Sequence, residues 1–253
     1  MQTITDLERV AAAHWRGTEE AWLGDWLLRA AGGFTGRANS VLPLGDPGLP
    51  LDDALAVVTG WYQQRGLPPM IAVPLPLDDD ERHELDERLA RRSWTVRPGP
   101  AFFMTADLPL AIRASELAAG RAVLVSPEPD DAWAARYHYR GQDHLPPVAR
   151  QVLTSAGEQS FVSIRDGGEV LAIARLSIAD GWAGLTAVEV HPGQRRQGLG
   201  VMITAAACRV AEQRGVERVF LQVEVDNAPA QALYQRLGFR YSHRYRYRLA
   251  PMS

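Results

Sequence analysis

Lysine is absent from this sequence, so all 27 basic side chains are arginine. The absence excludes acetylation of the protein on its own lysine side chains. Cysteine occurs once, at Cys208, which excludes an internal disulfide and fits a reducing compartment. Because Cys208 lies in an apolar helical pattern, we expect a buried thiol and not a nucleophile. The sequence also lacks an apolar run near the roughly 20 residues that a membrane-spanning helix needs.

Neither sign of charge is in large excess, and the net charge is -3 over 253 residues. Such a balance provides no general attraction to nucleic acid or to an anionic membrane. Residues 1–15 are acidic and amphipathic and lack the basic and apolar parts of a secretion signal. We therefore expect a cytoplasmic protein that binds neither nucleic acid nor membrane. Histidine and cysteine do not cluster at metal-ligand spacing, so we expect no metal.

Strand and helix signals alternate along the chain after residue 120. Apolar strand patterns are predicted at residues 121–126, 160–164, 169–178, 182–190, 218–225 and 239–249. Helical patterns are predicted at residues 130–139, 145–157, 199–210 and 227–237, with Asp130 or Asp131 capping the first. The turn signal RDGG at residues 165–168 joins the second and third strands as a hairpin. This order predicts a mixed α/β fold.

The junction between the strand at 182–190 and the next helix reads HPGQRRQGLG. Gly198 and Gly200 let the backbone run close to a ligand, because no side chain stands in the way. The helix that follows presents unpaired N–H groups and the positive end of its dipole. Arg195 and Arg196 add positive charge beside it. The junction therefore predicts a phosphate or pyrophosphate site, with a tight turn as the alternative.

Two motifs then resemble the GNAT superfamily of acetyl-CoA-dependent N-acetyltransferases. Residues 195–200, RRQGLG, match that superfamily's acyl-CoA loop, Arg/Gln-x-x-Gly-x-Gly/Ala. Residues 226–239, DNAPAQALYQRLGF, match its second signature in the expected order. The resemblance covers residues 122–249. It implies a mostly antiparallel twisted sheet with splayed central strands, flanked by helices, and acetyl-CoA as the acetyl donor.

The resemblance also implies a set of cofactor-binding residues. Pantetheine is expected beside the strand at 182–190, with the pyrophosphate on N–H groups at the start of the next helix. Asn227 lies seven residues before Tyr234, so the two share one face of the second helix. The expected set is Val188, Val190, Arg195, Arg196, Gln197, Gly198, Leu199, Gly200, Val201, Asn227 and Ala230.

The expected reaction is direct attack of a primary amine on the thioester in a ternary complex. The resemblance implies that Tyr234 is the general acid, since a tyrosine of ordinary pKa about 10 keeps its proton at neutral pH. Related ribosomal-protein acetyltransferases have a Glu that acts as the general base twelve residues before this Tyr, where the present chain has Gln222. Glu224 is therefore the first candidate base, Glu189 the second, and solvent the third. The acceptor is expected to be a small-molecule amine or a peptide N-terminus.

The first half of the chain resembles a degenerate copy of the second. Residues 64–66 and 213–215 both read QRG, 149 positions apart, between an apolar helix and an apolar strand. Leu89 stands where the second copy has Tyr234, and LGDPGLPLDD replaces the phosphate loop. Acidic residues there would repel a pyrophosphate. We therefore predict two GNAT-like domains in tandem, a degenerate one at 1–108, a linker at 109–120 and a catalytic one at 121–253.

The first half has two possible roles. It could act as structural support through an internal pairing that leaves the chain a monomer or a weak homodimer. Alternatively, Arg37 and Asn39 could reach the acceptor cleft. The alternating arginines Arg244, Arg246 and Arg248 are predicted to lie on a solvated strand face. The competing function is a catalytically silent acyl-CoA-binding sensor or scaffold.

Overall fold

One eight-stranded sheet runs through both halves of the chain, and a three-stranded sheet lies beside it. The computed structural model describes residues 2–78, 83–110, 121–138 and 145–251. Across the large sheet the strands are β4 (Met70–Leu75), β11 (Arg240–Leu249), β5 (Thr95–Asp107), β10 (Arg218–Glu224), β9 (Trp182–Val190), β8 (Glu169–Ala179), β7 (Glu158–Asp166) and β6 (Ala122–Ser126). The small sheet holds β1 (Glu19–Leu23), β2 (Trp26–Ala30) and β3 (Leu42–Pro43). The large sheet is antiparallel except where β9 and β10 run parallel.

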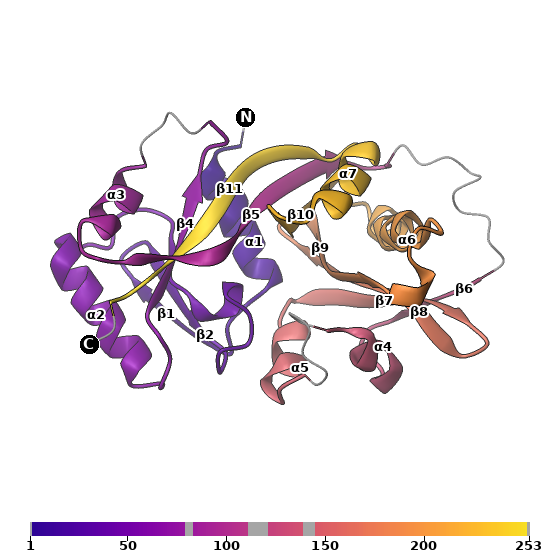
Figure 1. The fold of residues 1–253 in the computed structure, drawn as a ribbon, viewed down its shortest axis with the longest axis horizontal. Helices are drawn as coiled ribbons and strands as arrows, with labels where there is room; N and C mark the ends of the chain where they lie inside the picture. The colour runs from indigo at the N-terminus through magenta and orange to yellow at the C-terminus, as the bar shows by residue number, and fades with distance from the viewer. Residues whose placement is uncertain (1, 79–82, 111–120, 139–144, 252–253) are drawn as a thin grey trace.

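Helices lie on both faces of the large sheet (Figure 1). They are α1 (Ile4–His14), α2 (Leu51–Gln63), α3 (Glu84–Ala90), α4 (Asp131–Arg136), α5 (Val148–Leu153), α6 (Leu199–Gln213) and α7 (Ala228–Arg236), with short 3-10 turns η1 (Arg37–Asn39) and η4 (Pro192–Gln194). The Asp130 side chain accepts a hydrogen bond from the Trp133 N–H at 2.8 Å and caps α4. Of the two predicted caps, Asp130 is therefore the one used. The mixed α/β fold predicted from the sequence is confirmed.

The predicted strands of the second half are all present, but the helices expected over 130–139 and 145–157 are several residues shorter, as α4 and α5. The helix expected over 130–139 ends at Arg136, because Tyr137 leaves the helical conformation with φ -84° and ψ 102°. Residues 139–144 lie outside the described residues, as does most of the predicted linker. The hairpin turn forms at Gly167 and Gly168, whose φ angles are +53° and +94°.

The two halves have the same order of elements and exchange their last strands. Helix α2, β4, α3 and β5 follow one another in the first half as α6, β10, α7 and β11 do in the second. Strand β5 pairs with β10 of the other half, and β11 pairs with β4. Figure 1 shows β11 leaving the C-terminal lobe and ending beside α2 in the N-terminal lobe. The sheet is therefore continuous between the lobes.

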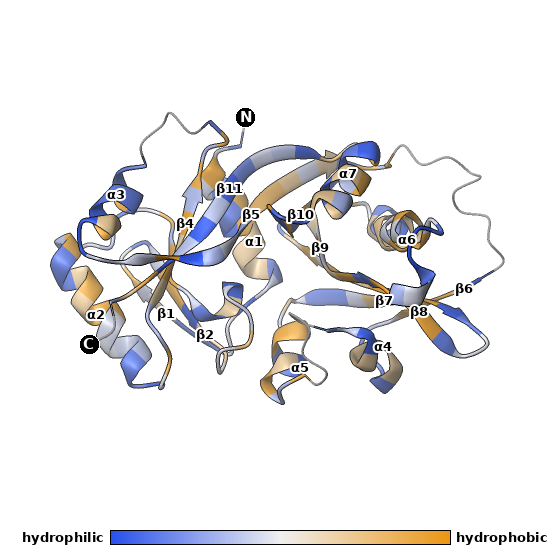
Figure 2. Cartoon of the chain, viewed as in Figure 1, coloured by the Kyte–Doolittle hydropathy of each residue, from blue (hydrophilic) through white to orange (hydrophobic). Residues whose placement is uncertain are grey.

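Apolar residues concentrate where the sheet meets its helices (Figure 2). The largest cluster lies between β7–β10 and the helices α6 and α7, and it includes Cys208, Tyr234 and Phe239. A second cluster fills the N-terminal lobe beneath α2 and contains Leu89 and Trp94. The Cys208 thiol is free and buried, as the sequence predicted. Leu89 and Tyr234 thus occupy corresponding core positions in the two halves.

A buried carboxylate joins the two lobes. Asp86 on α3 accepts hydrogen bonds from Arg248 at 2.8 and 2.7 Å and a further pair from Arg246, both on β11. Arg248 is 9% exposed. The prediction that these arginines lie on a solvated strand face is therefore wrong for Arg248. Alternation along the strand cannot show that α3 covers that face.

Candidate active site

The parallel strands β9 and β10 separate halfway along their length. They pair at Ala183 with Val219, at Gly184 with Phe220 and at Leu185 with Leu221. Both strands are fully described, and no pair joins them beyond Leu185. The opening therefore begins at Thr186 on β9 and at Gln222 on β10. Beyond it, the β9 edge that faces β10 has backbone groups free to bind the amides of an extended ligand.

A bulge in β9 lies at the start of this opening. Thr186 pairs with Arg175 and Glu189 with Ile173, so β9 carries one more residue than β8 between the two pairs. Ala187 has φ +51°, which marks the extra residue. A bulge changes the direction of the side chains that follow it. Val188 and Val190 pack against the cluster beneath α6 and α7, whereas Glu189 binds His138.

The loop from β9 to α6 is exposed and has an open helix start. Arg195, Arg196 and Gln197 are exposed, and Arg196 has φ +67°. Gly198 precedes α6 with φ +79° and makes no side-chain cap, so no side chain satisfies the first N–H groups of the helix. A Cβ on Gly198 would meet no atom within 4 Å. The loop therefore presents unsatisfied N–H groups and arginines to open space, which suits an anion.

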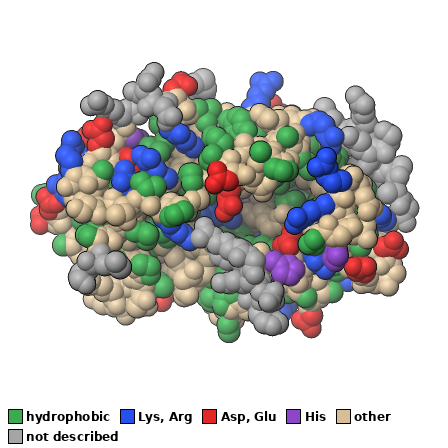
Figure 3. Space-filling model, in the orientation of Figure 1, with side chains coloured by type: hydrophobic (Ala, Val, Ile, Leu, Met, Phe, Trp, Pro, Cys, Tyr) green, Lys and Arg blue, Asp and Glu red, His purple; other side chains and the backbone are tan. Residues whose placement is uncertain are grey.

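A second glycine in the same loop has a different role. A Cβ on Gly200 would lie 2.6 Å from the Leu233 Cδ1 of α7. Gly200 therefore allows α6 and α7 to approach each other. In Figure 3 basic side chains gather beside a hollow near the middle of the molecule, over the region where Figure 1 places the start of α6.

Helix α7 places Tyr234 in the core beneath the opening. Its side chain is 8% exposed and lies edge to face against Phe239, with ring centroids 5.6 Å apart. Burial raises the pKa of the Tyr234 hydroxyl well above its usual value, and the nearby Cys208 raises it further. The hydroxyl is therefore protonated at neutral pH. Asn227 caps α7, since its Oδ1 accepts from the Ala230 N–H at 3.2 Å.

The two candidate bases have different surroundings. The Glu224 side chain is exposed at the end of β10. Glu189 is half-buried, and its carboxylate accepts from the His138 N–H at 2.9 Å and from the His138 ring Nδ1 at 2.8 Å. Because an ionised carboxylate only accepts hydrogen bonds, the ring Nδ1 carries the proton in this pair. His138 was missed in the sequence, where it lies 51 residues from Glu189 within a predicted helix.

The face of the sheet away from α6 and α7 receives an arginine from the first half. Arg37 Nη1 donates to Gln222 Oε1 at 2.8 Å, at the first β10 residue beyond the split. Asn39 has a local role, because its Oδ1 accepts from the N–H groups of Ala31 and Gly33. Of the two residues considered for the acceptor cleft, Arg37 contacts Gln222 of the C-terminal half and Asn39 stabilises its own loop.

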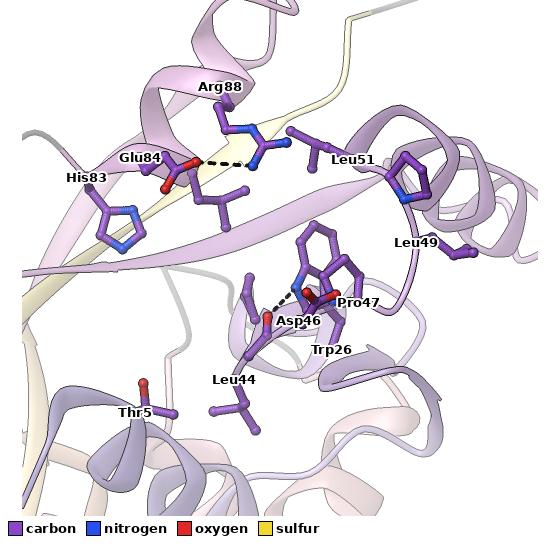
Figure 4. A pocket seen from close by; sticks show the side chains of 14 residues that line it. Thr5, Trp26, Leu44, Asp46, Pro47, Leu49, Leu51, His83, Glu84 and Arg88 are labelled. Atoms are coloured by element: carbon purple, nitrogen blue, oxygen red, sulfur yellow. Dashed lines mark hydrogen bonds and ion pairs between the residues drawn. The ribbon is translucent and has the colours of Figure 1, made fainter.

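The corresponding place in the N-terminal lobe holds an open pocket of about 660 Å³ (Figure 4). The loop before α2 and Trp26 form one wall, and α3 forms the other. Asp46 and Glu84 line it, and Glu84 pairs with Arg88 at 3.3 Å. Helix α2 begins after Pro50 with acidic residues in its first turn. Carboxylates at a helix start oppose phosphate binding.

Two further findings concern the described residues as a whole. Nowhere in these ranges do three or more His, Cys, Asp or Glu side chains gather as a metal site requires. Within the same ranges no helix combines the length and apolar character needed to cross a membrane.

Comparison with known proteins gives a consistent family. Residues 2–248 match the family model described as probable histone acetyltransferase Rv0428c C-terminal. The probable histone acetyltransferase Rv0428c of Mycobacterium tuberculosis is 32% identical over 255 residues, which cover 96% of this chain and 73% of that protein. The N-acetyltransferase YobR of Bacillus subtilis is 29% identical over 262 residues, which cover 98% of this chain and 99% of that protein. A GCN5-related N-acetyltransferase from Kribbella flavida has a similar fold, with a TM-score of 0.70 and 19% sequence identity. The match covers 99% of this chain and 95% of that one.

Proposed function

Because the chain belongs to the Rv0428c C-terminal acetyltransferase family of the GNAT superfamily, we propose that it transfers the acetyl group of acetyl-CoA to a primary amine. The chain is an acyltransferase of the GNAT type. The donor, the mechanism and the residues below are the proposal. The observation that carries it is the opening between β9 and β10, which leads directly to the uncapped start of α6.

The donor would lie along the open edge of β9. Backbone groups of Val188 and Val190 would bind the pantetheine amides, because β10 no longer pairs with this part of β9. N–H groups of Gly198, Gly200 and Val201 would bind the pyrophosphate. The exposed Arg195 and Arg196 side chains, with Gln197, would close over it. The missing side-chain cap at Gly198 supports this placement, since those N–H groups would otherwise be satisfied internally.

Tyr234 would protonate the leaving thiolate. The raised pKa of its buried hydroxyl keeps the proton available at neutral pH. A general acid must also reach the atom that it protonates. Tyr234 lies in the same cluster as Val188 and Val190, on the α6 and α7 side of the opening.

Glu189 or Glu224 would remove the ammonium proton. Glu189 lies on β9 beyond the split and is oriented by two hydrogen bonds from His138. Glu224 lies at the end of β10 and is exposed. A base that is held in place supports proton transfer better than a mobile exposed one. These contacts favour Glu189 over Glu224, the first candidate base from the resemblance.

We assign catalysis and acetyl-CoA binding to residues 121–253, and to residues 1–108 a role without acetyl-CoA binding. The strand exchange between β5 and β11 supports an internal pairing of two related halves. The acidic loop before α2 and Leu89 in place of Tyr234 support the loss of donor binding in the first half.

The test is release of free thiol from acetyl-CoA by the purified full chain with a panel of primary amines. Amine-dependent thiol release is expected. Tight acetyl-CoA binding without turnover of any amine would instead indicate the silent binding module. The Glu189→Gln and Glu224→Gln variants then identify the base. Loss of the acidic limb of the pH–rate profile is expected in Glu189→Gln, and the same loss in Glu224→Gln alone would reverse the assignment.

A further inference from the structure

We infer that the acceptor amine also carries a carboxylate, and that Arg37 of the first half binds this carboxylate on the face of the sheet away from α6 and α7. The inference rests on the proposed function and names the class of acceptor. It also gives the first half a direct part in substrate binding.

Two guanidiniums mark the point where the sheet opens. Arg37 donates to Gln222, the first β10 residue beyond the last pair with β9. Arg175 donates from Nη1 to the Thr186 hydroxyl at 3.3 Å. Thr186 is the first β9 residue beyond the last pair with β10. The neighbours of Thr186 and Gln222, Leu185 and Leu221, point into the cluster beneath α6 and α7. Because side chains alternate along a strand, Thr186 and Gln222 both point to the opposite face.

Trp15 holds these two guanidiniums close together. The Arg37 Cζ lies 4.7 Å from the centroid of the Trp15 ring, and the Arg175 Cζ lies 5.1 Å from it. The ring is 1% exposed, and its Nε1 donates to the Thr35 hydroxyl at 2.9 Å. A fixed aromatic surface therefore orients both cations at the end of the opening.

The positive charge at this place exceeds the negative charge beside it. Within the described residues, Arg29, Arg37 and Arg175 form no ion pair: Arg29 binds the Ser40 carbonyl and hydroxyl, and Arg175 Nε binds a carbonyl. The Arg175 side chain is fully buried, and its Nη2 has no hydrogen-bond partner. Burial, together with Arg37, lowers the pKa of Arg175 to about 9.

The nearby carboxylates already have partners. Glu8 lines a cavity of about 20 Å³ that Arg37 and Trp15 also line. Its Oε1 is bound to His243 Nε2 at 2.8 Å, and Glu189 is bound to His138. Arg29 and Arg37 thus line a cavity with one carboxylate, which a histidine already holds. Charged groups in a low-dielectric site need a counter-charge, and a bound anion would supply it.

The chemistry of this site favours a carboxylate as that anion. The planar fork of an arginine matches a carboxylate with two parallel hydrogen bonds. The donor would occupy the opening from the α6 side, so an acceptor would approach the thioester from the side of Arg37. The same positive charge disfavours an acceptor amine that lies among other lysines or arginines. An amino acid or a similar amino carboxylate fits these conditions.

Matched pairs of acceptors test the inference. L-α-amino acids, β-alanine and γ-aminobutyrate would each be assayed for thiol release beside the corresponding amide, with phosphoethanolamine as a separate probe. At least one acid is expected to have a kcat/KM about 10-fold or more above its amide, because a charge-assisted hydrogen bond is lost in the amide. Equal turnover of acids and amides would overturn the inference and leave the acetyltransferase activity standing. Preference for phosphoethanolamine would overturn the carboxylate.

Variants at Arg37 connect this preference to the residue. Arg37→Gln should lower kcat/KM for the preferred acid roughly 10- to 100-fold, mainly through KM, and lower that for the amide far less, with the Kd of acetyl-CoA unchanged. Arg37→Lys should lose less. Arg65→Gln is the control, because Arg65 also stacks on a tryptophan, Trp61, at 3.7 Å but forms its ion pair with Glu19 of the first half. An unchanged acid-to-amide ratio in Arg37→Gln would overturn the inference. Absence of thiol release with every amine would overturn the proposed function, and this inference with it.

Discussion

Two glycines of the RRQGLG loop should respond differently to the same added methyl group. Gly198 lies before α6 with φ +79°, where an added Cβ would meet no atom within 4 Å. A Cβ on Gly200 would instead meet the Leu233 Cδ1 at 2.6 Å. The first methyl would enter the space in front of the helix N–H groups. The second would enter the contact between α6 and α7.

The stability cost of Gly198→Ala follows from its backbone angle. A left-handed conformation costs an L-residue about 1–2 kcal/mol. In a chain of this size that lowers Tm by about 2–8 °C. Gly200→Ala gains up to about 1 kcal/mol of helix propensity, which offsets the displacement of the flexible Leu233 end. We therefore expect a modestly destabilised first variant and a second variant near wild-type stability.

Gly198→Ala should also weaken acetyl-CoA binding more than Gly200→Ala does, and this effect should be larger than the effect on stability. Displacing the pyrophosphate from one or two N–H groups removes about 1.5–3 kcal/mol for each hydrogen bond to a charged group, which is about 10-fold or more in Kd. Isothermal titration with acetyl-CoA measures it, and thermal unfolding checks the fold. Gly200→Ala should change Kd by only a few-fold. An unchanged Kd in Gly198→Ala, or an equal loss in both variants, would refute the placement of the pyrophosphate.

Three further outcomes are expected. Tyr234→Phe should keep acetyl-CoA affinity and lower kcat by on the order of 10²-fold or more in steady-state assays, and unchanged turnover would remove Tyr234 as the acid. Titration of the full chain should give one acetyl-CoA per chain, and two would contradict the loss of donor binding in the first half. Asp86→Asn should cost about 3 kcal/mol in denaturant unfolding at neutral pH, since Arg246 and Arg248 lose their counter-charge. Burial opposes ionisation of Asp86, but hydrogen bonds from Arg248 and Arg246 outweigh it and lower its pKa below 3.8. Asp86 therefore stabilises the fold above about pH 4, and its contribution is lost as pH falls through the lowered pKa. If Asp86→Asn lowered the free energy of unfolding equally at pH 3 and pH 7, this reasoning would be wrong.

The fold of the second half was accessible from the sequence because its signals are local. Apolar alternation, the RDGG turn and the glycine junction each depend on neighbours within a few residues, and each appears where the pattern indicated. The repeat was accessible for the same reason, since Gln64 and Gln213 stand in equivalent local patterns. The exchange of β5 and β11 between the halves could not be predicted from the sequence. A strand that pairs within its own half and a strand that pairs with the other half have the same local pattern.

The candidate site was accessible only where it belongs to a contiguous motif. The start of α6 and Tyr234 belong to such motifs. The bulge at Ala187 was not predicted, because the alternation of β9 reads as regular strand in the sequence. His138 was hidden for another reason, since it meets Glu189 across 51 residues. Arg37 was named as a residue that could reach the acceptor cleft, but its partner Gln222, 185 residues away, was not predicted. Contacts of this range depend on the tertiary packing of whole elements, which spacing along the chain does not encode.

The exchanged strand also explains how a half without a phosphate loop remains part of the site. Strand β5 pairs with β10 along its whole length, from Arg218 to Glu224. Beyond Leu221, β10 has lost β9 as a partner, so β5 alone continues to hydrogen-bond that end of the strand. Arg37 then contacts Gln222 at the same point from the other face. The first half therefore pairs with the part of β10 that β9 leaves and places Arg37 beside the opening, and neither contribution requires it to bind acetyl-CoA.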